Sequence, residues 1–362
     1  MDLSTICVHG CKKRYDTTGC ISVPIYLSTT FEHPEVGQSS GFNYSRTSNP
    51  TREHLEETVA AIEGGCGAIA FTSGMAAVSA LTEIFAPGDH IVASDDLYGG
   101  TYRLFNNISK KNGIDFTYAV SGQYSLASIM SAIRPTTKAV FIETPTNPMM
   151  HVTDIRKLVK ITRTRGILLV VDNTFLPYIQ RPLALGADMV LHSATKYLGG
   201  HNDVLGGLLV TKDAEINERL RFIAKTTGAC LSPFDSYMVI RGIKTLAIRM
   251  ERIQKTAKTV VKYLENSAKV RETHYCGVGG MVSFSTDSEE TAITVLNGVK
   301  IMKFAESLGG TESLITYPML QTHADMPKHE REARGIDECL LRLSVGLESA
   351  SDLIDDLKQV GI

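Results

Sequence analysis

The segment LLVVDNTFLPYIQRPLALGADMVLHSATKYLGGHND, residues 168–203, contains two short runs that are apolar along nearly their whole length, LLVVD and MVLHS. Such runs are typical of parallel strands that helices bury on both faces of a sheet. The first run ends in a carboxylate, Asp172, and the carboxyl ends of parallel strands form the edge at which α/β sheets hold ligands. Three residues beyond the second run stands Lys196, between small hydroxyl residues and a glycine pair. The segment therefore predicts an α/β fold with a functional site at this edge.

The same pattern extends over about residues 66–211, where seven β-rich runs alternate with amphipathic stretches. The runs are GAIAFTS, DHIVASDD, DFTYAV, KAVFIETP, LLVVDNT, DMVLHSA and GGLLVT. One stretch between them, DIRKLVKITRTRG, places Ile155, Leu158 and Val159 at helical spacing and has Gly166 as a stop. We therefore expect a three-layer domain in which helices cover both faces of the sheet.

The chain divides into three parts. Residues 1–45 are rich in Ser, Thr and Pro and are expected to form an arm, whereas residues 46–233 hold the predicted sheet. Residues 234–362 start with DSYMVIRGIKTLAIRMERIQKTAKTVVKYLEN, which predicts one long helix, and continue with GGMVSFS and LLRLSVGLE. This last part is expected to form a smaller α+β domain.

Composition excludes several classes of protein. The chain has 362 residues, a net charge of −2 and 43% hydrophobic residues, the balance of an ordinary globular protein with no basic excess for nucleic acid. It lacks an 18-residue apolar run, and its N-terminus lacks the order of a signal peptide, so we expect no membrane contact and a cytoplasmic location. The seven cysteines are dispersed without a CxxC pair, which predicts reduced thiols and no metal site.

Lys196 and Asp172 suggest a particular chemistry. A lysine at a strand-to-loop junction can act as a Schiff-base amine, because partial desolvation frees its lone pair. A lysine alone is weak support, since most lysines are solvated surface charges. Asp172 precedes it by 24 residues, and pairing this buried carboxylate with a pyridinium nitrogen would offset the cost of its burial. The alternative for Asp172 is a helix cap or an ion pair.

Two further stretches fit a flat, phosphorylated cofactor. TSGMAA follows a strand and opens a helix, so the backbone N–H groups of Gly74 and Met75 would face an anion. A turn of small residues is also common for plain close packing. The hydroxyls of Ser193 and Thr195 would reach the same phosphate, and Tyr98 in DDLYGGTY is suited to stacking on a ring. The alternative for Tyr98 is a half-exposed loop residue.

The motifs together resemble a known family. TSGMAA, DDLYGGTYR, ETPTNP, VVDNTF, HSATKYLGGH, ESLGGTESL and LLRLSVGLE occur in this order, with YSRTSNPT as a further match. They resemble the pyridoxal-phosphate enzymes of cysteine and methionine metabolism, which include cystathionine γ-synthases, cystathionine γ- and β-lyases, methionine γ-lyases and O-acetylhomoserine thiol-lyases. The resemblance implies pyridoxal 5'-phosphate as cofactor and the aspartate-aminotransferase-like fold (fold type I). This fold has a mainly parallel seven-stranded sheet and a smaller C-terminal domain.

The resemblance also implies roles for individual residues. Lys196 would form the Schiff base with the cofactor and move protons, Asp172 would pair with the pyridinium, and Tyr98 would stack on the ring. The remaining cofactor contacts would come from Gly74, Met75, Ser193 and Thr195 at the phosphate and from Asn147 at the ring edge. Tyr44 and Arg46 of YSRTSNPT would bind the phosphate of a neighbouring subunit, within a homotetramer built from two dimers.

On the substrate side, the resemblance matches Arg342 to the arginine that binds the substrate α-carboxylate in a bidentate fork. Ser307 matches a serine near that carboxylate and the lysine. Glu312 occurs in both synthase-like and lyase-like relatives and does not separate them. Asn43 stands where many relatives have an acidic residue for a distal ammonium, and a neutral amide binds that cation less well.

Several details favour the branch of bacterial cystathionine γ-synthases and O-acetylhomoserine thiol-lyases. These are GHND, ESLITYP and the lack of about twenty residues before GGM, while Gly99 argues against methionine as the main substrate. The first hypothesis is γ-replacement on O-acetyl- or O-succinylhomoserine by cysteine or by a small thiol or sulfide. The second is a cystathionine γ- or β-lyase that releases a 2-oxo acid and ammonia. A third, a catalytically idle binding subunit, is disfavoured because Lys196, Asp172, Tyr98 and Arg342 are all present.

Overall fold

The computed structural model of the protein describes residues 1–10, 18–322, 324 and 326–362, and its larger sheet has seven strands. Their order is β1-β7-β6-β5-β4-β2-β3, and β7 runs antiparallel to both neighbours while every other adjacent pair is parallel. The strands are β1 (Gly67–Phe71), β2 (His90–Ser94), β3 (Asp115–Ala119), β4 (Thr137–Glu143), β5 (Leu168–Asp172), β6 (Met189–Ser193) and β7 (Gly207–Thr211). The mainly parallel seven-stranded sheet predicted from the sequence is confirmed.

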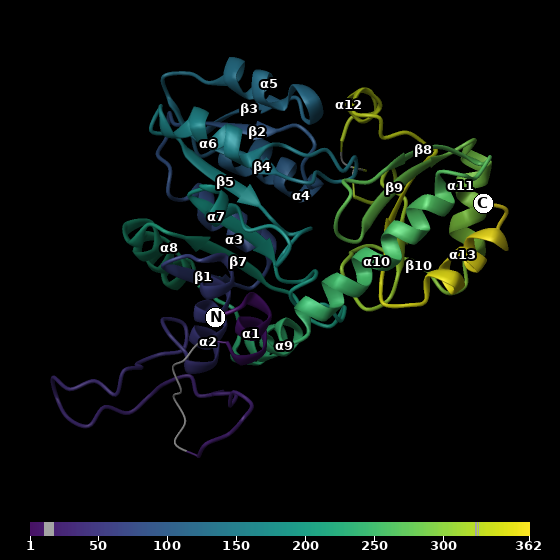
Figure 1. Cartoon of the computed structure of the whole chain (residues 1–362). Coiled ribbons are helices and arrows are strands. Elements are labelled where there is room, and N and C mark those ends of the chain that lie inside the picture. The colour runs from purple at the N-terminus through teal and green to yellow at the C-terminus, as the bar shows by residue number, and fades with distance from the viewer. Residues whose placement is uncertain (11–17, 323, 325) are drawn as a thin grey trace.

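Helices cover both faces of this sheet (Figure 1). Side chains alternate along each strand, so Val170 and Leu191 pack with α3 and α8 on one face, while Val171 packs with α5 and α6 and Val190 with α2 on the other. The helices in this part of the chain are α2 (Pro50–Glu63), α3 (Gly74–Thr82), α4 (Gly99–Leu104), η1 (Phe105–Ser109), η2 (Gly122–Tyr124), α5 (Ser125–Ala132), α6 (Ile155–Arg163), α7 (Pro182–Leu185) and α8 (Ala214–Thr227). The expected three layers are therefore present.

A second, smaller sheet lies beyond the large one (Figure 1). Its strand order is β10-β11-β12-β9-β8, and it packs with α11, α13 and the second half of α10 around one apolar core. The elements are β8 (Val270–His274), β9 (Met281–Thr286), α11 (Glu289–Gly298), β10 (Lys303–Phe304), β11 (Leu314–Thr316), α12 (Lys328–Ala333), β12 (Leu340–Ser344) and α13 (Ala350–Lys358). This agrees with the fold expected for the C-terminal part of the chain.

The long helix predicted over residues 235–266 is wrong in one respect, because the structure has two helices there, α9 (Pro233–Ile243) and α10 (Leu246–Leu264). The carbonyl oxygen of Gly242 accepts a hydrogen bond from Arg249 Nη2 at 2.8 Å and another from Thr245 Oγ1 at 3.2 Å. These side chains cap the end of α9. The backbone of Gly242 also lies so close to the Gly199 carbonyl that a Cβ there would approach this oxygen to 2.1 Å.

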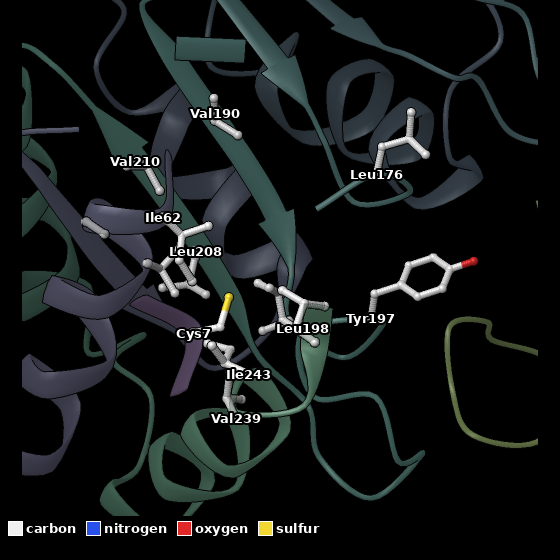
Figure 2. Packing of buried hydrophobic residues seen from close by; sticks show 14 of the residues in the cluster. Cys7, Ile62, Leu176, Val190, Tyr197, Leu198, Leu208, Val210, Val239 and Ile243 are labelled. Carbon is white, nitrogen blue, oxygen red and sulfur yellow. The ribbon is translucent and has the colours of Figure 1, made fainter. Parts of the chain in front are cut away.

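The N-terminal residues include a short helix, α1 (Leu3–His9), which packs against α2 and α10 of its own chain. Figure 2 shows the Cys7 side chain among Ile62, Leu208, Val239 and Ile243. Residues 18–48 extend away from the two sheets (Figure 1). Part of the predicted arm, residues 11–17, lies outside the described residues.

The arm carries apolar side chains that this chain leaves uncovered. Ile21, Leu27 and Val36 have relative exposures of 90%, 72% and 104%.

The six described cysteines are free thiols, and Cys11 lies outside the described residues. None of the described helices is long and apolar enough to cross a membrane. The described residues contain no cluster of metal-ligating side chains.

The close approach at Gly242 predicts that Gly242→Ala destabilises the protein. The added methyl group would meet the carbonyl oxygens of Leu198 and Gly199, which are backbone atoms that cannot rotate away. We expect the free energy of unfolding to fall by about 1–3 kcal/mol, as for other overpacked sites. Urea denaturation measures this, with Arg241→Ala, on the exposed side of α9, as a control expected to stay within about 0.5 kcal/mol. Equal stability of the two variants would contradict the assignment of Gly242 to this contact.

Candidate active site

A cavity of about 220 Å³ lies between the carboxyl edge of the large sheet and the second sheet. The residues around it come from the start of α3, the ends of β4, β5 and β6, the turn that follows β6, and the strand β12. The predicted site residues that line it are Gly74, Met75, Tyr98, Asn147, Asp172, Ser193, Thr195, Lys196, Ser307 and Arg342. The fold thus brings residues that are far apart in the chain, from Gly74 to Arg342, together around one cavity.

Lys196 lies in the turn after β6, and its Nζ donates a hydrogen bond to Ser307 Oγ at 2.7 Å. Burial first, and then the nearby Arg342 guanidinium, lower the pKa of this amine, while Glu306 opposes both, and the resulting pKa is about 8. A lysine of this kind is partly neutral near physiological pH. It therefore has a lone pair available for attack on a carbonyl carbon or for proton transfer.

Asp172 ends β5 with its carboxylate at the cavity. Its Oδ1 accepts hydrogen bonds from Thr174 N at 3.0 Å and Thr174 Oγ1 at 2.6 Å. Burial raises the pKa of Asp172, and within the described part of the chain no ion pair compensates the charge. Thr174 thus orients the carboxylate, and a cationic ring nitrogen in the cavity would supply the missing opposite charge.

The start of α3 forms the anion-binding end of the cavity. Ser73 caps this helix by accepting a hydrogen bond from Ala76 N at 3.0 Å. A Cβ on Gly74 would lie 3.0 Å from the Ser193 side chain, so glycine lets Ser193 approach the backbone of the first helical turn. N–H groups at a helix N-terminus together with a hydroxyl fit a phosphate.

Tyr98 is the residue before α4, and its ring lines the cavity. Its backbone N–H donates to Glu143 Oε2 at 2.9 Å. At both positions that follow, Gly99 and Gly100, a side chain would collide with neighbouring atoms. A Cβ on Gly100 would lie 2.5 Å from the Tyr98 ring, and one on Gly99 would lie 2.4 Å from the carbonyl oxygen of Thr322. The YGG sequence therefore makes room for the ring and for the segment that passes over it.

Arg342 is the largest fully buried side chain of the protein among the described residues. Its Nη1 donates to Asn147 Oδ1 at 2.9 Å, and its Nη2 donates to Ser307 O at 3.0 Å and to Thr316 Oγ1 at 3.1 Å. Burial lowers the pKa of Arg342 to about 10, so the guanidinium remains charged at neutral pH. Among the described residues, the hydrogen-bond partners of this cation are neutral, and an anionic substrate group is the natural complement.

Four predicted site residues lie outside the cavity. The Arg46 guanidinium lies over the Tyr44 ring at 5.4 Å and donates to the carbonyl oxygen of Lys225. The carbonyl oxygen of Asn43 accepts from Phe31 N at 3.1 Å. Glu312 accepts a hydrogen bond from Asn202 Nδ2 at 2.8 Å.

The cavity wall also contains residues that sequence reasoning did not single out, among them Glu143, Thr174 and Glu306. Glu143 stands at the end of a predicted strand, in register with Asp172, so its place at the edge was available from the pattern. Thr174 follows Asp172 by two residues, a spacing typical of local side-chain hydrogen bonding. Glu306 immediately precedes Ser307, and its role needed the packing of the second sheet against the first.

The chain is similar to known proteins over nearly its whole length. The sequence pattern of the family described as "Cys/Met metabolism PLP-dependent enzyme" matches residues 4–360. The chain belongs to this family. The cystathionine gamma-synthase/O-acetylhomoserine (thiol)-lyase of Bacillus subtilis is 50% identical over 345 residues, which cover 95% of this chain and 92% of that protein. The cystathionine gamma-lyase of the same organism is 46% identical over 376 residues, covering 99% of both.

Solved structures agree with this assignment. The cystathionine gamma-lyase from Lactobacillus plantarum, complexed with L-serine, superposes with a TM-score of 0.96 at 40% identity, covering 99% of this chain and 98% of that one. A cystathionine gamma-synthase from Xanthomonas oryzae pv. oryzae gives 0.95 at 38% identity, covering 99% of this chain and 97% of that one. Fold type I and the family resemblance predicted from the sequence are confirmed. The relatives include cystathionine γ-synthases, γ-lyases and β-lyases, so the family does not by itself determine which of these reactions the chain catalyses.

The family implies pyridoxal 5'-phosphate, and the residues of the cavity fit this cofactor. The uncompensated carboxylate of Asp172 suits the ring nitrogen, the start of α3 suits the phosphate, and the Lys196 amine suits the aldehyde carbon. Tyr98 supplies an aromatic surface at the same cavity. When bound, the cofactor supplies an electron sink for a carbanion at the substrate Cα.

This reading predicts that Lys196→Ala prevents covalent attachment of the cofactor. Wild-type protein reduced with borohydride should gain the mass of one reduced cofactor per chain, on the peptide that contains Lys196. The alanine variant should gain none, whereas Lys160→Ala, on the exposed side of α6, should behave as wild type. Intact and peptide mass spectrometry make the measurement. Attachment of the cofactor to another residue in the wild-type protein would refute the role of Lys196.

Proposed function

We propose that the protein catalyses γ-replacement on an O-acylhomoserine, O-acetyl- or O-succinylhomoserine, with cysteine or a small thiol or sulfide. The Cγ–O bond breaks and releases the acyl group as a carboxylic acid, and a Cγ–S bond forms to give cystathionine or homocysteine. The observation that carries this proposal is the contact of the low-pKa Lys196 amine with Ser307, whose carbonyl binds Arg342. The similarity to synthases at 50% and 47% identity supports it.

The chain's own residues divide the work. The Arg342 guanidinium pairs with the substrate α-carboxylate, and its hydrogen bonds to Asn147 and Thr316 fix its plane. Lys196 Nζ takes the proton from the substrate Cα, and Ser307 Oγ holds this amine at the side of the cavity next to Arg342. Asp172 keeps the ring nitrogen protonated. After it has released the first proton, Lys196 Nζ takes a proton from Cβ, and the acyl carboxylate leaves from Cγ. Protons return to Cβ and Cα after the thiol has formed the Cγ–S bond.

A second cavity adjoins the first and shares Thr195, Leu205, Glu306 and Ser307 with it. Its wall includes two acidic residues, Asp203 and Glu306. These carboxylates would attract the ammonium group of a thiol substrate such as cysteine. These carboxylates offset the neutral amide of Asn43 and keep cysteine as a substrate of the proposed reaction.

The carboxylate of Glu306 therefore predicts selective effects of Glu306→Gln. The KM for cysteine should rise about tenfold, because a charge-assisted contact to its ammonium is replaced by a neutral one. The KM for sulfide, which carries no ammonium, should change little. Steady-state kinetics with the two nucleophiles measure this, with Glu218→Gln, on the exposed side of α8 and outside both cavities, as the matched control. Equal effects on both nucleophiles would exclude Glu306 from ammonium binding.

A lyase is the second candidate, and the 46% identity to a cystathionine gamma-lyase over 99% of the chain favours keeping it. One experiment separates the two. Purified holoenzyme is given O-acetylhomoserine with and without cysteine, and both cystathionine and 2-oxobutanoate are quantified by mass spectrometry. Cystathionine that forms only with cysteine supports the synthase. Dominant 2-oxobutanoate, together with cleavage of added cystathionine, would establish the lyase.

We also propose that a second copy of the chain completes the site. The two cations lining the described cavity are Lys196 and Arg342, so the α3 end has hydroxyl and N–H groups but no positive charge for a phosphate. Tyr44, at the end of the arm, and Arg46, directly after it, lie outside this cavity and would reach the phosphate of a neighbouring subunit. A dimer follows from this arrangement, and the tetramer and the cytoplasmic location stay predictions from the sequence.

Subunit mixing tests the shared site. Arg46→Ala and Lys196→Ala homodimers should each be nearly inactive at limiting cofactor. Hybrid dimers formed by dissociation and reassociation should recover about a quarter of wild-type activity, because each hybrid has one intact site and half of the dimers are hybrids. Size exclusion and mass spectrometry verify the hybrids. If Arg46 served its own chain's site, the mixture would recover nothing.

A further inference from the structure

Three buried carboxyl groups stand side by side at the carboxyl edge of the large sheet. Asp172 ends β5, Glu143 ends β4, and Asp96 follows β2 by two residues, and these strands are neighbours in the order β5-β4-β2. Glu143 and Asp172 are direct partners in the register of β4 and β5. Their relative exposures are 9% for Asp172, 6% for Glu143 and 3% for Asp96. The proposed reaction uses Asp172 and gives the other two no task.

Glu143 contacts the turn that carries Tyr98. Its Oε2 accepts a hydrogen bond from Tyr98 N at 2.9 Å. Tyr98 is the residue before the first turn of α4, and its own side chain makes no capping hydrogen bond. Its backbone N–H thus depends on a side chain from a different strand. Because the Tyr98 ring lines the same cavity as Glu143, this one bond fixes the backbone from which the ring projects.

The other groups around Glu143 determine its charge. Burial raises the pKa of Glu143 well above its ordinary value, and the carboxylates of Asp172 and Asp96 also raise it, while the hydrogen bond from Tyr98 N and the Arg342 guanidinium oppose them. These surroundings favour the protonated form of Glu143. In that form one oxygen still accepts from Tyr98 N, and no second negative charge is added beside Asp172.

We propose that Glu143 is a positioning residue that sets the Tyr98 ring over the cofactor by binding the Tyr98 backbone N–H. This inference rests on the proposed function only in that it takes the cavity as the cofactor site. It goes beyond it by giving the second carboxyl group of the edge a task. A glutamine can do the same work, because its carbonyl oxygen accepts the same hydrogen bond, whereas alanine cannot.

The test compares Glu143→Gln and Glu143→Ala with wild type and with Ser94→Ala. Ser94 Oγ accepts a hydrogen bond from Glu143 N at 3.2 Å, so its loss disturbs the same strand end without touching Tyr98. Hydrogen exchange of the Tyr98 amide in cofactor-free protein should quicken about tenfold in Glu143→Ala, as expected for a lost buried hydrogen bond. Wild-type exchange is expected in Glu143→Gln and Ser94→Ala.

Circular dichroism of the bound cofactor gives a second readout. Its visible band should change in Glu143→Ala, because the stacked ring moves, and keep its wild-type shape in Glu143→Gln. If the alanine variant does not fold, Glu143→Asp, which withdraws the carboxyl group by one methylene, carries the same expectation. Wild-type exchange and dichroism in both the alanine and aspartate variants would overturn the proposal.

A glutamine variant as impaired as the alanine variant would overturn the proposal, because glutamine keeps an oxygen that accepts the Tyr98 hydrogen bond. Infrared difference spectra of wild type against Glu143→Gln report the protonation state of the carboxyl group, because a protonated group gives a band that the variant lacks. Neither exchange nor dichroism requires turnover. Wild-type protein that binds the cofactor but makes no thioether would therefore refute the proposed function and leave the role of Glu143 measurable.

Discussion

The hydrogen bond from Lys196 Nζ to Ser307 Oγ joins the two halves of the site. Lys196 belongs to the turn after the last parallel strand of the large sheet, and Ser307 belongs to the loop before β11 of the second sheet. The bond therefore requires the second sheet to be docked on the carboxyl edge of the first. The same loop presents the Ser307 carbonyl to Arg342, so a single docking geometry places both the amine and the guanidinium.

Burial of charged groups at this edge gives the site its reactivity. Removal of water penalises every charge there, which lowers the pKa of Lys196 to about 8 and raises those of Asp172 and Glu143. The penalty is tolerable because each group has hydrogen-bond partners or complements a group that the ligand brings. The Lys196 amine thus loses its proton more easily than an exposed lysine, and a cation bound next to Asp172 would stabilise its buried carboxylate. These are the two requirements of amino-acid chemistry with a pyridine cofactor.

Much of the fold was predictable because buried parallel strands have a distinct pattern. All seven strands of the large sheet occur where apolar runs predicted them, and the edge carrying Asp172 and Lys196 followed from strand direction. The break between α9 and α10 was not predictable, since it depends on Arg249 reaching back to Gly242 and on a carbonyl of the distant loop at Gly199. Periodicity along one helix contains no information on such contacts.

The site shows the same division. Motif order predicted many of the side chains that line the cavity. Glu143 and Glu306 were among those missed, because their roles depend on which strands and loops become neighbours. Tyr44, Arg46, Asn43 and Glu312 lie outside the cavity of this chain, and for Tyr44 and Arg46 the explanation offered here is a second subunit.

The most direct test of the account is the titration of Lys196 in cofactor-free protein. With ¹⁵N-labelled lysine and Lys196→Ala for assignment, nuclear magnetic resonance reports the protonation of this one amine as pH rises. The account predicts a midpoint near 8, because the docked second sheet buries the amine beside Arg342. A midpoint near the ordinary lysine value of 10.5 would show a solvated amine and contradict the arrangement on which the proposed chemistry depends.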